Sequence, residues 1–429
     1  MRLIKTILSI IIIDFFFFST TFSFSGGINT KMVLAVIGLL FLAYDMVRER
    51  GISLPRQFLI IIGYSLVISL FAVISTTYNN TTDRFYSTYF LSMLTWLIGA
   101  YGTLRLLLSV NGKLDLELMA KYIVLICIIQ GLMAVIQDLY LPLKVFINSL
   151  VPATWVEEHG RLYGLGTTTC LDTGGIRYAM GCIFSAYLIT NTSKKGEGWQ
   201  VPLYISAFIL ITITGNMVAR TTIVGSLLGL AYMLVGANAF SKNLSYAQIR
   251  IWAWAVLLVS LYVVGIIALY NSSPILHQHL RFGFEGFFNW VEDGYWHTGS
   301  NDTLASMYVF PDNLKTWLIG DGYFGTPDDD PNYLGASMSG YYMGTDVGYL
   351  RFIFYFGVFG LLVFSLFIIY CGKVCYKYYT ECRLLVLAFI ALHFAIWFKV
   401  ATDCFFVFAL LMSLEYIETT VLNEQAENV

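Results

Sequence analysis

Long apolar runs recur along the whole of this sequence. An α-helix needs about 20 consecutive apolar residues to cross the hydrocarbon core of a bilayer. Of the 429 residues, 58% are hydrophobic and 12% are charged, whereas soluble domains carry about 25% charged residues. A membrane β-barrel would instead show short segments of alternating polarity. The runs therefore predict an all-α, polytopic membrane protein in which residues 1–429 form a single transmembrane domain.

Twelve runs have the length that a membrane span requires. The run at 174–190 is the weakest, because Arg177 lies near its start, and the turn at 216–221 is unusually tight. The twelve predicted spans lie near residues 6–24, 32–47, 57–76, 87–108, 120–140, 174–190, 200–216, 221–239, 251–270, 347–371, 384–401 and 403–419.

The distribution of Lys and Arg predicts the orientation, because short cytoplasmic connections are enriched in both. With twelve spans, 15 of the 25 basic residues fall on the side of the N-terminus. We therefore expect both termini in the cytoplasm and two long connections, 140–173 and 271–345, on the outer side. Connections of more than about 12–15 residues are usually functional or disordered. Residues 282–310 alone hold nine Phe, Trp and Tyr, which favours a folded segment with short helices.

Several arginines lie on the predicted outer side, against this bias. A charge on a membrane helix costs about 2.5–3.5 kcal/mol at the bilayer centre, so such residues usually face a protein interior or a water-filled cavity. A guanidinium group binds phosphate or carboxylate through two parallel hydrogen bonds. The alternative is that each arginine pairs with a structural acid such as Asp14, Asp138 or Asp172, or extends to the headgroups. We expect a diphosphate-binding cavity formed by Arg161, Arg177, Arg220, Arg281 and Arg351.

The stretch "GTDVGYLRFIFYFGVFG", residues 344–360, places an aspartate and an arginine at the start of an apolar run. Five residues on a helix correspond to a rotation of about 500°, so Asp346 and Arg351 are not expected to pair directly. A ligand phosphate or another acid is the expected partner of Arg351. Asp346 is predicted to be a catalytic base at the edge of a cavity. The alternative, which can coexist with this role, is that Thr345 or Asp346 caps the helix.

Other candidate sites have weaker support. The glycine-rich segment 160–181 allows close approach of the backbone to an anion, but it lacks the G-K-[ST] of a phosphate-binding loop. A catalytic histidine, or a calcium site in "PDDDP" at 327–331, is possible in principle; an acidic turn is the simpler interpretation of the latter. No metal site and no disulfide framework are expected. The predicted outer histidines are His159, His277, His279 and His297.

Five segments in this order resemble a known family. The order resembles the O-antigen and capsular polysaccharide polymerases of the Wzy type, which share a superfamily with the O-antigen ligases. The resemblance covers roughly residues 160–360. The segments are "GRLYGLG", "ITGNMVARTT", "RFGFEGFFNW", "WLIGDGYFG" and "TDVGYLRFIFYFGVFG".

The resemblance implies an enzyme of the bacterial inner membrane with about a dozen helices and one large periplasmic loop. Such enzymes are inverting glycosyltransferases that need no metal or other cofactor. Their donor and acceptor are both undecaprenyl-diphosphate-linked oligosaccharides, and a chain-length regulator protein is a possible partner. Nucleic acid is not expected as a partner, because residues 271–345 hold nine acids against Arg281 and Lys315.

The resemblance also implies roles for particular residues. Arg161, Arg220 and Arg281 match the family's arginines by position, and the ligases often carry a histidine where this chain has "TDVG". This difference favours a polymerase over a ligase. The predicted catalytic residues are Asp346, Arg220 and Arg281. The predicted contacts to diphosphate or sugar are Arg161, Arg177, Arg351, Tyr349 and Tyr163.

Two other classes of membrane protein are alternatives. A flippase for lipid-linked oligosaccharides would place its ionisable residues near mid-membrane, between repeats with broken helices. A membrane acyltransferase would need a histidine deep in a span, and His393 has no such context. The unusual charges lie instead at outer span ends and in outer connections, which favours chemistry at the outer face.

Overall fold

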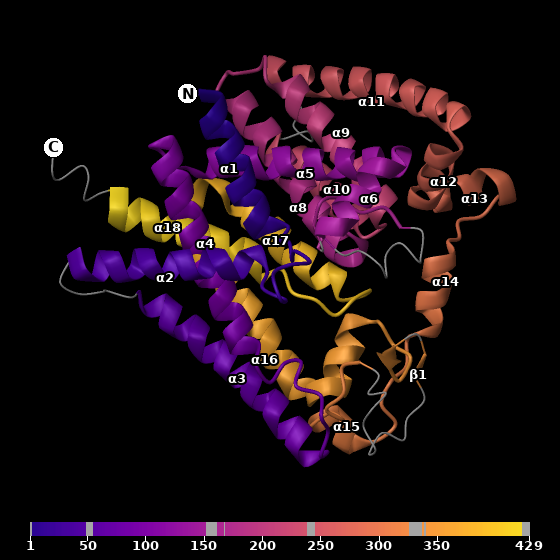
Figure 1. The fold of residues 1–429 in the computed structure, drawn as a ribbon. Helices are drawn as coiled ribbons and strands as arrows, with labels where there is room; N and C mark the ends of the chain where they lie inside the picture. The colour runs from indigo at the N-terminus through magenta and orange to yellow at the C-terminus, as the bar shows by residue number, and fades with distance from the viewer. Residues whose placement is uncertain are drawn as a thin grey trace.

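The computed structural model describes residues 2–48, 55–151, 161–166, 168–237, 245–325, 337–338 and 340–422. The helices of this part of the chain are joined by loops, and one short antiparallel hairpin is formed by β1 (Ser337–Met338) and β2 (Tyr341–Tyr342). The helices are α1 (Arg2–Phe17), α2 (Thr30–Arg48), α3 (Arg56–Tyr78), α4 (Tyr89–Asn111), α5 (Leu116–Leu139), α6 (Leu141–Leu150), α8 (Leu171–Lys194), α9 (Val201–Val218), α10 (Thr222–Gly236), α11 (Tyr246–Ser272), α12 (Pro274–Gly283), α13 (Glu285–Asp293), α14 (Gly299–Ser306), α15 (Leu314–Leu318), α16 (Gly348–Tyr378), η1 (Thr380–Cys382), α17 (Arg383–Ile396), α18 (Phe405–Tyr416) and η2 (Ile417–Leu422) (Figure 1).

Each of the twelve predicted spans overlaps a helix. Seven helices of the described chain are long and apolar enough to cross a membrane, namely α2, α3, α4, α5, α9, α11 and α16. These seven mark the chain as a membrane protein. The count of twelve spans and their orientation stay predictions.

The weakest predicted span is a helix almost entirely enclosed by protein. Helix α8 packs against α5, α9, α10 and α17, and its side chains are buried almost continuously from Gly174 to Ser193. A helix that is surrounded by protein does not need the apolar surface that lipid requires. Its glycines let neighbours approach closely: a Cβ at Gly181 would lie 2.7 Å from the sulfur of Cys127. Contacts with neighbouring helices therefore stabilise this helix, so its sequence does not need the high hydropathy of a lipid-facing span.

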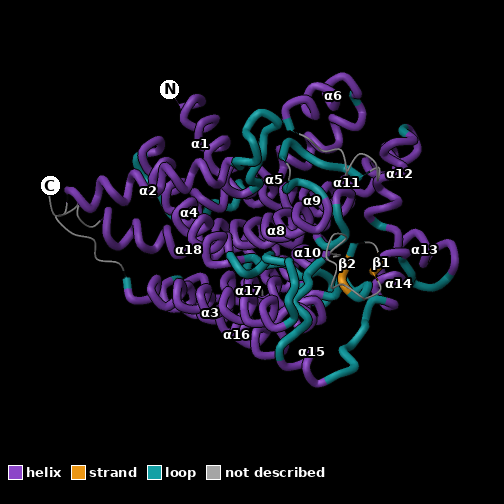
Figure 2. The backbone as a smooth tube through the Cα atoms, turned by 60° about the horizontal axis from the view of Figure 1, so that its bottom comes forward, coloured by secondary structure: helices purple, strands orange, loops and turns teal. Residues whose placement is uncertain are grey.

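The chain termini and the long connection after α11 lie at opposite ends of the helical bundle. In both views the start of α1 and the end of α18 lie at one end, and α12, α13, α14 and the β-hairpin lie at the other (Figures 1 and 2). The side of the membrane on which each end lies stays a prediction. We call the end that bears α12–α14 the loop end.

Local sequence signals define the short helices of the loop end. Ser273 caps α12, where its hydroxyl accepts from the backbone N–H of Leu276 and a proline occupies the first helical position. Gly294, at φ 80°, ends α13 in the left-handed conformation. Thr298 caps α14, and Asn313 caps α15. The predicted short helices in this connection are confirmed.

Helix α16 is broken at Phe356 and Gly357, and the loop after α15 occupies the break. The freed carbonyl of Phe354 accepts from the backbone N–H of Asp321 at 2.5 Å. The carbonyl of Tyr355 accepts from the backbone N–H of Gly322 at 3.2 Å and from the Ser75 hydroxyl at 2.7 Å. Buried backbone groups need such partners, so the break joins α3, α16 and the loop end into one packed unit.

Glycine is required at position 357. Its φ of 71° and ψ of −179° lie in a region that other residues rarely adopt, and a Cβ there would lie 2.2 Å from the carbonyl oxygen of Leu318. We expect Gly357→Ala to destabilise the protein by about 1–3 kcal/mol from backbone strain, with a further loss from the contact. The measurement is the melting temperature of purified protein in detergent.

The matched control is Gly63→Ala in α3. A Cβ at Gly63 meets nothing within 4 Å, and alanine is favoured over glycine in a helix by about 0.5–1 kcal/mol. We therefore expect the control to melt at or above the wild-type temperature. Equal melting temperatures for Gly357→Ala and Gly63→Ala would contradict the role given to the break.

Candidate active site

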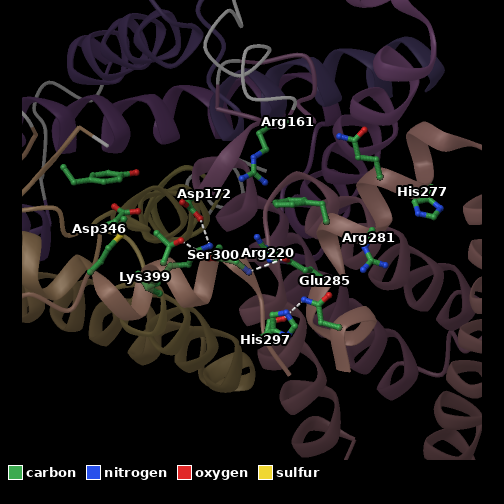
Figure 3. Close-up of a pocket in the computed structure, with 18 residues that line it drawn as sticks. Arg161, Asp172, Arg220, His277, Arg281, Glu285, His297, Ser300, Asp346 and Lys399 are labelled. Atoms are coloured by element: carbon green, nitrogen blue, oxygen red, sulfur yellow. Dashed lines mark hydrogen bonds and ion pairs between the residues drawn. The ribbon is translucent and has the colours of Figure 1, made fainter. Parts of the chain in front are cut away.

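A large cavity opens at the loop end, with a volume of about 1090 Å³ (Figure 3). Its walls come from the segment before α8, the start of α8, the turn between α9 and α10, helices α12–α14, the segment before α16 and the segment after α17. The lining residues are Arg161, Asp172, Arg220, His277, Gln278, Arg281, Phe282, Glu285, Asn289, His297, Gly299, Ser300, Thr303, Leu304, Met307, Tyr341, Asp346 and Lys399.

Two guanidinium groups meet on one aromatic ring in this cavity. The guanidinium of Arg161 lies 4.1 Å from the ring centroid of Phe282, and that of Arg220 lies 4.6 Å from it. Such cation–π contacts hold a planar guanidinium against a ring face. Burial, together with the neighbouring charge of Arg220, lowers the pKa of Arg161. Both groups remain charged at neutral pH, so Phe282 brings together two cations that would otherwise repel each other.

Arg220 and Arg281 are each held by a carboxylate. Arg220 donates a short, charge-assisted hydrogen bond to Glu285, which also accepts from the backbone N–H of Gly299. Arg281 binds both carboxylate oxygens of Glu292, at 2.7 and 2.5 Å. Within the described part of the chain, Arg161 forms no ion pair with a carboxylate. The donors of Arg161 are therefore the most available to an anionic ligand.

Two carboxylates, those of Asp172 and Asp346, lie on one side of the cavity. Asp172, at the start of α8, accepts from the hydroxyl of Thr221 at 2.5 Å and lies 3.3 Å from the ammonium of Lys399. In the close-up, Asp346, Asp172 and Lys399 lie on one side of the cavity (Figure 3). Arg281 and His277 lie on the other side, and Arg161 and Arg220 lie between the two groups. The cavity therefore holds two carboxylates, each paired with a cation, on one side, and two guanidinium groups at its centre.

Asp346 has the environment of a general base. Burial raises its pKa to about 6; the nearby charge of Arg351 opposes this rise and that of Asp172 adds to it. At neutral pH the group is mostly ionised and still close to the pH at which it can accept and return a proton, which suits acid–base catalysis.

The expected separation of Asp346 and Arg351 is wrong. Arg351 donates from Nη1 to Oδ1 of Asp346 at 3.0 Å and from Nη2 to the carbonyl oxygen of Phe324 at 2.8 Å. Its guanidinium carbon also lies 3.8 Å from the ring centroid of Phe324. Helix α16 begins only at Gly348, so Asp346 precedes the helix and the rotation per residue does not apply to the pair. Arg351 also precedes the break in α16 and is enclosed by protein.

The predicted capping role of Asp346 is also wrong. The N-cap position of α16 is Val347, and no side chain caps the helix there. The hydroxyl of Thr345 accepts from the backbone N–H of Val347 at 3.3 Å. The carboxylate of Asp346 instead lines the cavity and binds Arg351.

Four of the predicted contact residues lie outside the cavity lining. Arg351 lies behind Asp346. Arg177 is buried, where its guanidinium donates to the carbonyl oxygens of Phe17 and Thr173. The hydroxyl groups of the two tyrosines also bind protein: Tyr163 donates to Asn148, and Tyr349 donates to the carbonyl of Phe394.

The cavity therefore brings together only part of the predicted set of site residues. The members that line it are Arg161, Arg220, Arg281 and Asp346.

Sequence reasoning missed Lys399 and Glu285, and treated Asp172 only as a structural partner. The sequence signals of two of them are weak: Asp172 is an aspartate at the start of a glycine-rich helix, and Lys399 is a single lysine near the end of a predicted span. Two of the predicted outer histidines, His277 and His297, do line the cavity. The histidine at position 279 instead binds Asp138 through its Nε2, at 2.7 Å.

Two candidates fall outside the described residues, namely His159 and "PDDDP" at 327–331. Among the residues that the structure does describe, no group of three or more His, Cys, Asp and Glu side chains is placed to hold a metal ion.

The chain was compared with known proteins in three ways. No model of a protein family, no curated protein and no solved structure matches it.

The cavity is expected to bind a diphosphate. We expect Arg161→Ala to weaken the binding of inorganic diphosphate at least tenfold, which corresponds to about 1.4 kcal/mol, because it removes the guanidinium least engaged with carboxylates. Isothermal titration calorimetry on purified protein measures this affinity.

The control is Arg56→Ala. Arg56 is an exposed arginine at the start of α3, and it does not line the cavity. Its removal should leave the diphosphate affinity unchanged. An equal loss in both variants would indicate a non-specific charge effect and contradict the site.

Proposed function

We propose that this protein polymerises oligosaccharide repeat units linked to a polyprenyl diphosphate. The observation that carries the proposal is the convergence of Arg161, Arg220 and Arg281, from three separate connections, with Asp346 in one cavity. Arginines suit the diphosphate of the donor, and a carboxylate suits the hydroxyl of the acceptor. The resemblance in the order of the sequence segments points to the same class of reaction.

The proposed reaction is a single displacement at the anomeric carbon. The hydroxyl oxygen of the acceptor sugar attacks that carbon and forms the new glycosidic bond, while the bond from the carbon to the diphosphate oxygen breaks. The proton of the hydroxyl passes to the carboxylate of Asp346. The leaving polyprenyl diphosphate keeps the electron pair of the broken bond, and the configuration at the anomeric carbon inverts because attack and departure occur on opposite faces.

The arginines act on the leaving group in this scheme. Preorganised hydrogen-bond donors that point at developing negative charge lower the activation barrier. The loss of one such donor typically reduces kcat by a factor of about 10²–10³. Arg220 and Arg161 are already held in place by Phe282, and Arg281 by Glu292. Little reorganisation is needed when the charge appears on the diphosphate.

The proposal includes the membrane arrangement. We propose twelve spans, both termini in the cytoplasm and the loop end in the periplasm, with the protein in a bacterial inner membrane. The distribution of Lys and Arg supports this orientation. A periplasmic cavity would meet the repeat units where they are assembled, and a chain-length regulator protein would act on the same face.

An O-antigen ligase is the closest alternative, because it would use the same donor and differ in its acceptor. A flippase is supported less, since the cavity and its charges lie at the loop end, where α12–α14 form part of its wall (Figure 1). The three activities give different products from one lipid-linked donor.

The main test is a polymerisation assay in nanodiscs with a lipid-diphosphate-linked oligosaccharide and EDTA. We expect a ladder of repeats for the wild type. Asp346→Asn should reduce the rate by about 10²–10⁴-fold through loss of the base, and Arg220→Ala should reduce it by about 10²–10³-fold. Products are resolved on a gel.

The matched control is Asp302→Asn, an exposed carboxylate on α14 that does not line the cavity. It should keep the wild-type ladder. A wild-type ladder from Asp346→Asn would remove Asp346 from the mechanism. Transfer only to a lipid A core would make the protein a ligase, and movement of intact donor without transfer would make it a flippase.

The pH profile gives an independent test of the base. Because Asp346 must be ionised and its pKa is about 6, we expect kcat/KM to fall about tenfold per pH unit below that value and to level off above it. Loss of the positive charge in Arg351→Met destabilises the carboxylate, so the acid limb should move to higher pH. Arg351→Lys keeps the charge and should move it little. A limb that stays fixed in Arg351→Met would contradict Asp346 as the titrating group.

A further inference from the structure

An apolar groove lies beside the cavity, on the other side of α12. It has a volume of about 620 Å³ and runs between α5, α9, α11 and α12. Among the residues that line it, only Ser206, Thr214 and Tyr262 carry a hydroxyl group, and the Thr214 hydroxyl donates to the carbonyl of Leu210. The other lining residues are aliphatic side chains, Met217 and Gly265.

The groove extends deep along the helical bundle. Helix α9 lines it from Ser206 to Met217, and α11 lines it from Leu258 to Leu269. At 1.5 Å per residue, each stretch is about 16 Å long, which is roughly half of the hydrocarbon thickness of a bilayer. Both helices, and α5, are long and apolar enough to cross the membrane. The groove therefore lies where a hydrocarbon chain would lie.

One wall of the groove stands apart from the bundle. Helix α11 is almost unburied and runs along the outer edge of the molecule, past α9 (Figure 1). The groove is thus open towards the lipid, so a chain could enter it sideways from the membrane without passing through the protein.

Helix α12 is the partition between the groove and the cavity. Its Leu276 and Leu280, four residues apart, line the groove, while His277 and Arg281, also four apart, line the cavity. Residues four apart lie on one face of a helix, so α12 has one face towards each space. An amphiphile with its charged head at Arg281 can place its apolar chain in the groove by crossing the width of a single short helix.

We infer that the groove holds the polyprenyl chain of the donor, with the diphosphate of the same molecule at Arg161, Arg220 and Arg281. This inference rests on the proposed function and deepens it, because it says from which side of the cavity the donor and the acceptor enter. The donor enters from the side of α12 and its sugar points towards Asp346. The acceptor hydroxyl must then arrive from the side of Asp346, opposite the donor's chain (Figure 3).

A polyprenyl chain fits the groove better than a phospholipid does. A polyprenyl diphosphate has a single chain, matching a single groove, and its headgroup chemistry matches the arginines of the adjoining cavity. Gly265 also leaves a notch in the wall, since a Cβ there would meet nothing within 4 Å. Methyl branches can occupy such a notch.

Gly265 offers a way to fill the groove without disturbing the fold. Because the space beside it is open, Gly265→Trp places an indole in the groove and displaces no protein atom at its Cβ. The matched control is Gly63→Trp on α3, since Gly63 likewise meets nothing within 4 Å and does not line the groove. Both substitutions add the same side chain to a long apolar helix.

The test measures binding of two probes to each variant in nanodiscs: undecaprenyl diphosphate, and inorganic diphosphate. Gly265→Trp should weaken binding of undecaprenyl diphosphate at least tenfold and leave binding of inorganic diphosphate unchanged. Gly63→Trp should bind both as the wild type does. Native mass spectrometry of the wild type and of Gly265→Trp then identifies lipids that remain bound after purification.

Three outcomes would overturn the inference: wild-type affinity of Gly265→Trp for undecaprenyl diphosphate, an equal loss in Gly63→Trp, or loss of a co-purified phospholipid from Gly265→Trp with polyprenyl binding unchanged. The last result would make the groove a site for a structural lipid. Binding needs no sugar transfer, so a chain that binds undecaprenyl diphosphate through the groove but makes no ladder would retain the groove and lose the proposed polymerase function.

Discussion

The enclosure of charge is the constraint on which this structure depends. An arginine cannot face hydrocarbon without a large penalty, and Arg351 avoids it through protein contacts alone. The break at Gly357 ends the first part of α16, the loop that fills the break brings the ring and carbonyl of Phe324 to the guanidinium, and Asp346 supplies the counter-charge. One packing arrangement thus neutralises the guanidinium of Arg351 and gives hydrogen-bond partners to the backbone carbonyls freed by the helix break. It also sets the position of the Asp346 carboxylate in the cavity.

The same constraint divides the arginines predicted on the outer side into two kinds. Arg177 satisfies its charge with backbone carbonyls inside the bundle and stacks on Phe406, so its charge serves the packing of α8. Arg161 and Arg220 share the ring of Phe282 at the surface of a large cavity. Among the described residues, only one of these two adjacent cations is paired with a carboxylate, and an anionic ligand would complete the site.

Helix α12 lies between the polar cavity and the apolar groove and lines both of them. With its ten residues it is too short to span a bilayer, and it separates a polar space from an apolar one with its two faces. A lipid-linked substrate has the same division, with a charged head and an apolar chain. In the proposed function, this one helix would hold the charged head of such a substrate on one face and its apolar chain on the other.

The sequence by itself determined that this is a helical membrane protein with arginines at or near span ends, because a long apolar run leaves its signal in consecutive residues. It did not predict the pairing of Asp346 with Arg351, since Asp346 precedes the helix and the helical rotation per residue does not apply to it. Only the tertiary structure decided which arginines share a space. Arg161 and Arg177 have the same signature, a cation beside a span in a glycine-rich segment, yet one lines the cavity and the other is buried. Hydropathy and helical period describe neighbours along the chain, whereas a site is formed by distances between segments far apart in it.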